Sequence, residues 1–344
     1  MKISRRIAVT VAAAATAALL MAGCTSRNDS GASDGGGDSG GGDLTVAFVP
    51  KLQGIPYFEA MNTGGQKAAE ELGFTWLYQG PTTADAAAQA DIVRSYIQQG
   101  VDVLFVAPND PDSLAPLLQE AKDAGIHVAT TDTDAPDSVR EVFVSQASSQ
   151  GIGETLTDTL LKAMGGKGKY AIVSCGETAA NLNAWIEVMR EHTAEKYPDS
   201  EIVDVIYAGE DQAAATSMAT DLMNAHPDLT GLVGVCTSSA PGVAQAVTDA
   251  GRIGKVFTVG LGTPKSMQPY LESGASSGSI LWDVEALGYL TGWAGVQLAS
   301  DAGFEATNKV SDALPAVEYD DSTKVLLLGP PMIFTAENAG DYDY

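Results

Sequence analysis

From Leu44 onward, the chain alternates short runs rich in apolar and β-branched residues with amphipathic helical windows. This alternation is typical of parallel sheets whose strands are joined by crossover helices. The predicted strands are residues 44–49, 74–79, 102–106, 126–131, 141–145, 169–174, 202–207, 231–236, 255–260 and 278–283. The predicted helices are residues 57–72, 84–99, 113–124, 149–164, 179–195, 211–225, 240–250, 264–273 and 285–300. So many strands favour two doubly wound α/β domains over a single sheet.

The order of these elements also suggests where the two domains meet. We expect residues 44–145 and about 285–310 to form the N-terminal domain, and residues 146–284 and about 311–344 to form the C-terminal domain. The chain would then cross between the domains near 144–148, near 283–285 and within 304–322, which makes a three-stranded hinge.

The first 24 residues have the pattern of a bacterial lipoprotein signal. Basic residues precede an apolar run from Ile7 to Ala22, which is about four residues shorter than the ~20 that span a bilayer. Small residues then lead to Cys24. Cleavage before Cys24 would leave its thiol to carry a diacylglycerol and so anchor the protein to the outer face of a membrane. The alternative is a secreted protein with a coincidental cysteine, and both place the mature chain outside the cytoplasm.

Residues 24–43 consist mainly of Ser, Gly and Asp and predict a flexible tether between the lipid and the folded domains. Removing the signal takes away three basic residues and changes the formal charge from −25 to −28. Such a surface repels the phosphates of nucleic acids and anionic lipids, so we predict no nucleic-acid partner. Contact with the membrane would come from the lipid alone.

Two cysteines remain after Cys24 is assigned to the lipid. Cys175 and Cys236 each end a predicted strand, and the strands can lie close together. Because neighbouring parallel strands rarely carry a bridge, we expect two buried thiols, with a disulfide as the less favoured alternative.

In open α/β sheets, ligands bind at the carboxyl ends of the strands. The predicted strand ends carry hydrogen-bonding side chains, namely Lys51, Asn109, Asp132, Asn181 and Asp283. They form no nucleophile–histidine pair and no metal-ligand cluster. The sequence therefore predicts neither an enzyme nor a metal or cofactor site, and the three histidines are expected to be structural.

Several of these positions allow two interpretations. Tyr57 and Phe58 follow the first strand, where one ring could stack on a sugar and the other belong to the core. Asp132 could accept hydroxyl hydrogens from a ligand or cap a turn, and its position favours the ligand. Asp134, next to Ala135-Pro136, is expected to be structural. Asp283 could bind ligand or cap the following helix.

Together these features resemble the class I periplasmic binding proteins that serve ABC sugar importers of the ribose type, over residues 44–344. Four motifs resemble the branch of the rhamnose-binding proteins and autoinducer-2 receptors: VPKL at 49–52, GLGTP at 260–264, LWD at 281–283 and FTAENAGDYDY at 334–344. The resemblance implies a ligand in the cleft between two α/β domains.

The family's binding residues, carried over by position, fall on Lys51 and Asp132, which match the pattern. Autoinducer-2 receptors have an Asp-Gln pair before a tryptophan, whereas Asn181 and Leu182 precede Trp185 here. Pro241 also matches the family. Leu182 suits a ligand with an apolar edge, such as a deoxysugar methyl, so the departures favour a monosaccharide.

The sequence thus predicts a monomeric, lipid-anchored solute-binding protein that delivers a monosaccharide, rhamnose or a related sugar, to an ABC permease. An autoinducer-2 receptor is the nearest alternative, and a sensory lipoprotein that presents a sugar to a signalling partner is another. A secreted hydrolase would typically need paired carboxylates about 5–10 Å apart, and Asp132 and Asp283 are the pair to consider.

Overall fold

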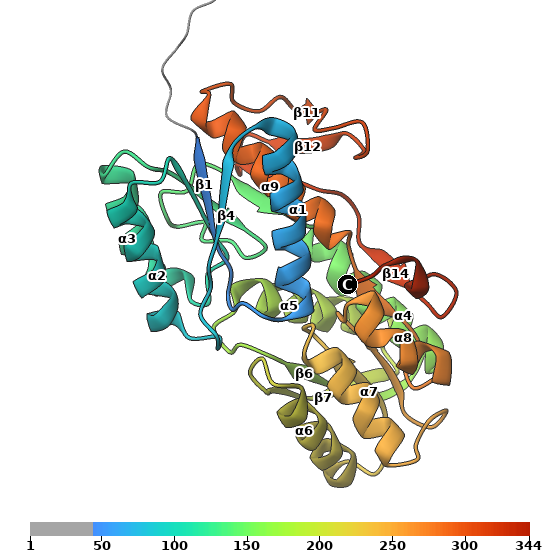
Figure 1. Ribbon diagram of the computed structural model, residues 1–344. Coiled ribbons are helices and arrows are strands. Elements are labelled where there is room, and N and C mark those ends of the chain that lie inside the picture. The colour runs from blue at the N-terminus through green and yellow to red at the C-terminus, as the bar shows by residue number, and fades with distance from the viewer. Residues whose placement is uncertain (1–43) are drawn as a thin grey trace, which may run out of the picture. The chain divides into compact units, whose positions relative to one another are not determined.

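The computed structural model describes residues 44–344, which form two α/β domains with mostly parallel sheets (Figure 1). The signal segment, Cys24 and the tether at 24–43 lie outside the described residues. Each of the ten predicted strands and nine predicted helices is present, with ends shifted by at most two residues.

The first sheet has eight strands. In spatial order they are β11 (Thr307–Asn308), β12 (Val317–Asp320), β13 (Val325–Leu327), β5 (Phe143–Ser145), β4 (His127–Thr131), β3 (Val103–Val106), β1 (Thr45–Val49) and β2 (Thr75–Tyr78). Strands β1 to β5 and β13 are parallel, and β12 pairs antiparallel with both β11 and β13. Its helices are α1 (Pro56–Leu72), α2 (Ala86–Gln99), α3 (Pro111–Asp123) and α9 (Val284–Ala299).

The second sheet has six strands. In spatial order they are β14 (Met332–Phe334), β10 (Ser279–Leu281), β9 (Phe257–Gly260), β8 (Leu229–Gly234), β6 (Gly168–Ser174) and β7 (Ser200–Tyr207). Only β14 is antiparallel to its neighbour. The helices of the second domain are α4 (Ser149–Ala163), α5 (Ala180–Lys196), α6 (Gln212–Ala225), α7 (Ser239–Asp249) and α8 (Pro264–Ser273). A short 3-10 helix, η1, follows at Ala339–Asp341.

Strand β1 shows why the sheets need helices on both faces. Alternate side chains of a strand point to opposite faces. Val46 and Phe48 belong to the apolar cluster that includes α1 and α9, whereas Ala47 and Val49 belong to the cluster with α2 and α3. All four side chains are buried, so both faces of the sheet are covered.

The chain crosses between the sheets at 146–148, 282–283 and 328–331. The predicted division after residue 310 is therefore wrong, because β12 and β13 belong to the first sheet and only β14 joins the second. Strand β13 continues the first sheet beyond the edge of β5. Strands β11 to β14 have two to four residues each and lack the periodicity that made the longer elements predictable.

The second crossing returns the chain to α9, which lies against α1 (orange beside blue in Figure 1). Two glycines permit this close approach. A Cβ at Gly64 would overlap the carbonyl of Glu285, and a Cβ at Gly288 would overlap the carbonyl of Met61. None of the helices between residues 44 and 344 combines the length and hydropathy needed to cross a bilayer.

The variant Gly288→Ala is expected to lower the free energy of unfolding by about 1–3 kcal/mol, because the added methyl group forces α1 and α9 apart. Urea unfolding followed by circular dichroism measures the loss. Gly329→Ala is the matched control, since a Cβ at Gly329 meets no atom within 4 Å. Equal stability of the two variants would contradict this account of the helix pair.

Candidate functional site

A cavity lies between the carboxyl ends of the two sheets, where the topology predicts a ligand site. Its volume is about 40 Å³, taken as the space open to the centres of water molecules. The lining residues come from both domains: Lys51, Ile55, Tyr57, Phe58, Asp132, Asn181, Leu182, Trp185, Glu210, Cys236, Thr237, Leu261, Leu281 and Trp282.

The polar centre of the cavity is a buried ion pair. Lys51 follows β1 and Asp132 follows β4, and Lys51 Nζ lies 3.8 Å from Asp132 Oδ2. Each side chain is only 6% exposed. Because a buried charge is costly unless it is paired and hydrogen-bonded, the residues around this pair are constrained to satisfy it.

Asp132 accepts hydrogen bonds from two hydroxyl groups of its own domain. Tyr57 Oη donates to Oδ1 at 2.7 Å, and Thr133 Oγ1 donates to Oδ2 at 3.0 Å. Burial raises the pKa of Tyr57 well above its usual value, and the Asp132 carboxylate raises it further. Tyr57 therefore stays protonated and remains a donor at neutral pH.

The backbone of Asp132 is also unusual. Its φ is 63°, in the left-handed region that non-glycine residues rarely adopt, and its N–H donates to Val144 O at 3.2 Å. Backbone strain of this kind costs about 1–3 kcal/mol and persists only where the surroundings enforce it. Here it places the Asp132 side chain in the cavity beside Lys51.

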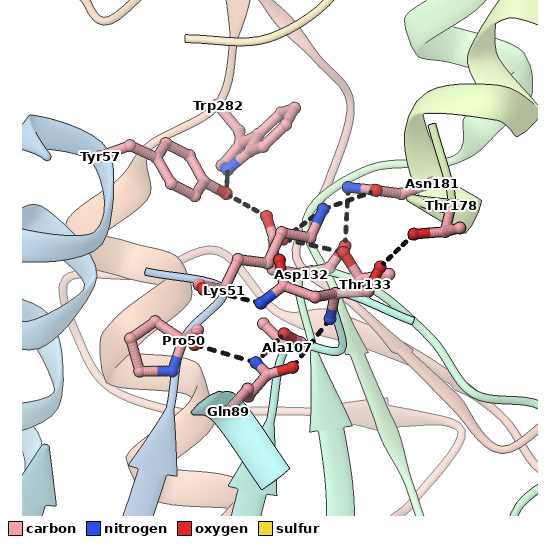
Figure 2. Close-up of polar contacts among 11 residues, drawn as sticks. Pro50, Lys51, Tyr57, Gln89, Ala107, Asp132, Thr133, Thr178, Asn181 and Trp282 are labelled. Atoms are coloured by element: carbon pink, nitrogen blue, oxygen red, sulfur yellow. Dashed lines mark hydrogen bonds and ion pairs between the residues drawn. The ribbon is translucent and has the colours of Figure 1, made fainter. Parts of the chain in front are cut away.

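Hydrogen bonds connect the two domains directly across the cleft (Figure 2). Lys51 Nζ donates to Asn181 Oδ1 at 2.9 Å, and Thr178 Oγ1 donates to Asn109 O at 3.0 Å. Trp282, in the second crossing, donates from Nε1 to Tyr57 Oη at 3.2 Å. The domains therefore meet at the polar centre itself.

Gln89 positions the loops beneath this centre. Its buried side chain donates from Nε2 to Pro50 O at 2.9 Å and to Ala107 O at 2.8 Å, and its Oε1 accepts from Asn109 N at 2.9 Å. Figure 2 shows this amide below Lys51. One side chain from α2 thus holds the loops after β1 and β3 together.

Of the ten residues predicted to bind ligand, the structure brings seven together around the cavity: Lys51, Tyr57, Phe58, Asp132, Asn181, Leu182 and Trp185. Asn109, Pro241 and Asp283 do not line it. The Asn109 amide supports the site from behind by donating to Lys51 O at 2.8 Å. Pro241 is buried within α7, and Asp283 caps α9 by accepting from Ala286 N at 2.9 Å.

Other polar residues have the structural roles that were expected for them. Asp134 accepts a hydrogen bond from Arg140 Nη2 at 2.7 Å and another from Thr130 Oγ1 at 2.8 Å. His127 and His192 lie beside carboxylates, Glu141 at 3.1 Å and Asp158 at 2.7 Å. None of these side chains reaches the cavity.

Glu210, which is not among the residues predicted from the sequence, lines the cavity after β7. It directly precedes Asp211, which caps α6, so the pair had the appearance of an ordinary helix start. Trp282, in the motif LWD at 281–283, also lines the cavity although it is not among the residues predicted to bind ligand. It packs edge-on against Tyr57, at 5.9 Å between ring centroids, and edge-on against Trp185, at 6.0 Å.

The expectation of two free thiols is wrong, because Cys175 and Cys236 form a disulfide. Strands β6 and β8 are neighbours in the sheet. Both cysteines follow the last paired residues of these strands, beyond the hydrogen-bonded ladder, and their Cα atoms are 6.1 Å apart. This separation lies within the usual range for a disulfide. Beyond the last paired residues, the hydrogen bonds of the sheet no longer keep the two cysteines apart.

Comparison with known proteins agrees with this architecture. The family model described as "Periplasmic binding protein domain" matches residues 46–303. The chain belongs to the periplasmic binding protein family. It is therefore a binding protein and not an enzyme.

Two solved structures are similar to this chain over most of its length. LsrB from Clostridium saccharobutylicum, in complex with AI-2, is 29% identical over 88% of this chain and 100% of that one, with a TM-score of 0.82. An ABC transporter solute-binding protein from Clostridium phytofermentas with bound L-rhamnose is also 29% identical, over 88% of this chain and 98% of that one, with a TM-score of 0.82. The D-ribose/D-allose-binding protein of Pseudomonas aeruginosa is 29% identical over 67% of this chain and 74% of its own.

The double variant Cys175→Ser/Cys236→Ser is expected to lose about 2–4 kcal/mol of unfolding free energy, since the disulfide restricts the unfolded chain. Denaturant unfolding with and without a dithiol reductant measures the effect. Reduction should destabilise the wild-type protein and leave the double variant unchanged. Alkylation of both thiols in the unreduced, denatured wild type would contradict the bridge.

Proposed function

We propose that this chain is an extracytoplasmic, lipid-anchored solute-binding protein of an ABC importer, and that its cavity binds a monosaccharide, rhamnose or a related sugar. The observation that carries this proposal is the buried cluster of Lys51, Asp132 and Asn181 between two domains, bordered by aromatic rings. The importer permease and a monomeric state are parts of the same proposal.

The chemistry of the cavity suits a sugar. A sugar hydroxyl both donates and accepts hydrogen bonds, and the Lys51 ammonium and the Asp132 carboxylate supply one partner of each kind. Aromatic rings such as Phe58 and Trp282 can pack on the C–H face of a sugar ring. Leu182, buried in the first turn of α5, offers an apolar contact for a deoxysugar methyl group.

The relatives support the same ligand class. One solved relative is a solute-binding protein with L-rhamnose bound, and a curated relative is named for D-ribose and D-allose. Both come from the family to which this chain belongs. The family implies an extracytoplasmic location, in agreement with the signal pattern that ends at Cys24.

Binding would couple to closure of the two domains. The hydrogen bond from Lys51 to Asn181 and that from Trp282 to Tyr57 join groups from opposite sides of the cleft. A ligand that bonds to both sides binds the closed form more tightly than the open form, and this difference in affinity stabilises the closed form. The permease would then recognise the closed form.

Autoinducer-2 is the second candidate ligand. The similarity to the AI-2 complex of LsrB is as high as that to the rhamnose complex. Asn181 and Leu182 stand where the autoinducer-2 receptors have an Asp-Gln pair, which favours the sugar. Unpaired polar groups of a bound ligand cost about 1–3 kcal/mol each.

A soluble mature form, starting at residue 24 with Cys24→Ser, can be unfolded and refolded to remove carried-over ligand and then titrated calorimetrically with L-rhamnose, D-ribose and autoinducer-2. We expect micromolar or tighter binding of a sugar. Tight binding of autoinducer-2 alone would transfer the function to the second candidate, and binding of none would refute both.

The variant Lys51→Met is expected to weaken sugar binding about 10- to 100-fold, because it removes a charged donor and leaves Asp132 buried without its partner. Lys67→Met is the matched control, since Lys67 is exposed on α1. Calorimetry gives both affinities, and thermal unfolding shows whether each variant is folded. Equal affinities would remove Lys51 from the binding site.

Expression of the full chain in a bacterial host fed with labelled palmitate tests the anchor. We expect the label on the wild-type protein in the membrane fraction, and its loss in Cys24→Ser with release of the protein from the membrane. A wild-type protein that is secreted without label would instead be an ordinary exported protein.

A further inference from the structure

Glu210 is a carboxylate in the cavity wall that the predicted site does not include. It follows β7 and stands on a loop that the end of β6 holds in place, since Ala208 N donates to Ser174 O at 2.9 Å and Gly209 N donates to Cys175 O at 3.2 Å. Gly209 has a φ of 66°, which turns the chain toward the cavity.

The second domain also fixes the carboxylate itself. Ser238 Oγ, in the loop after β8, donates to Glu210 Oε2 at 3.1 Å. A carboxylate oxygen of Glu210 and the sulfur atoms of Cys175 and Cys236 lie within 4.8 Å of one another. The disulfide thus packs behind the carboxylate, and three strand ends set its position.

Glu210 has more free acceptor capacity than Asp132. Both oxygens of Asp132 already accept hydroxyl hydrogens, from Tyr57 and Thr133. Among residues 44–344, only Ser238 donates to Glu210, and its Oε1 accepts no hydrogen bond. Since a carboxylate can accept about four hydrogen bonds, Glu210 is the acidic group best able to receive one from a ligand.

Glu210 shares the cavity with two other charged groups, Lys51 and Asp132. The pKa of Glu210 is raised, chiefly by burial; the Lys51 ammonium and the Ser238 hydroxyl oppose this rise, and the Asp132 carboxylate adds to it. Lys51 is therefore close enough to both carboxylates to influence them, and the lined cavity contains one cation and two anions. Two carboxylates against one ammonium disfavour an anionic ligand, and Glu210 keeps an acceptor oxygen that no protein group uses.

We propose that Glu210 is a specificity-determining residue of the cavity, and that its carboxylate accepts a hydrogen bond from one hydroxyl group of a neutral polyhydroxylated ligand. This inference rests on the proposed function, since it concerns the same cavity. Glu210 would grip the ligand from the second domain, opposite Lys51 and Asp132 in the first.

The test is a double-mutant cycle between the side chain and the ligand. L-rhamnose and its mono-deoxy derivatives are titrated into the wild type and into Glu210→Gln, both as the mature chain with Cys24→Ser. We expect Glu210→Gln to weaken L-rhamnose binding about 10- to 100-fold. For the wild type, one deoxy derivative should bind about 10- to 100-fold more weakly than L-rhamnose. For Glu210→Gln, the same derivative should bind nearly as tightly as L-rhamnose.

Glu177→Gln is the matched control, because it makes the same charge change on an exposed residue after the neighbouring strand β6 and outside the cavity lining. It should bind L-rhamnose as the wild type does. Glu210→Asp retains the charge but shortens the side chain. It provides a second variant if Glu210→Gln does not fold, and it too should lose affinity.

The outcomes separate the two proposals. If the wild type binds L-rhamnose and a folded Glu210 variant binds it with less than a twofold change in affinity, the proposed function stands and the role of Glu210 is overturned. Equal losses in Glu210→Gln and Glu177→Gln would also overturn it, since the effect would be one of overall charge. Failure of the wild type to bind any sugar tested overturns both proposals.

Discussion

The buried pair of Lys51 and Asp132 is the constraint on which the site depends. Two charges withdrawn from water destabilise a fold unless their remaining donors and acceptors are satisfied. The structure meets this requirement with two hydroxyl groups that donate to Asp132 and a side-chain amide that accepts from Lys51. The amide belongs to Asn181, in the other domain. The need to satisfy a buried ammonium therefore becomes an interaction between domains.

The same requirement explains the arrangement of the supporting residues. Lys51 and Asp132 come from strand ends that are not adjacent, because β3 lies between β1 and β4. Gln89 and Asn109 tie the backbone on either side of Lys51 to the loop after β3. The left-handed backbone at Asp132 completes the approach. Packing and backbone bonds in the first domain thus hold the charged groups before any ligand is present.

The second domain presents a different kind of wall. Its strand ends carry a disulfide, a carboxylate at Glu210 and hydroxyl groups at Thr237 and Ser238. Trp185 and Trp282 extend this wall with apolar surface. A ligand between the domains would meet a prearranged ion pair on one side. On the other side it would meet the Glu210 carboxylate, which lies beside the disulfide and accepts a hydrogen bond from Ser238. This asymmetry suits a ligand with hydroxyl groups at one edge and an apolar surface at another.

The sequence by itself determined the longer strands, the helices and half of the residues that line the cavity. Apolar runs such as Val103–Val106 specify strands covered on both faces, and parallel crossovers bring their carboxyl ends to one edge. That rule placed Lys51 and Asp132 at one edge of the first sheet, and the family resemblance placed Asn181 across the cleft from them. Tertiary structure decided the features that depend on contacts between residues far apart in the sequence. Short antiparallel strands such as β12 join whichever sheet edge is open, and Asp283 is used as a helix cap because α9 begins there. The disulfide and the place of Glu210 depend on which strands become neighbours, and that order is set by long-range packing of the sheet.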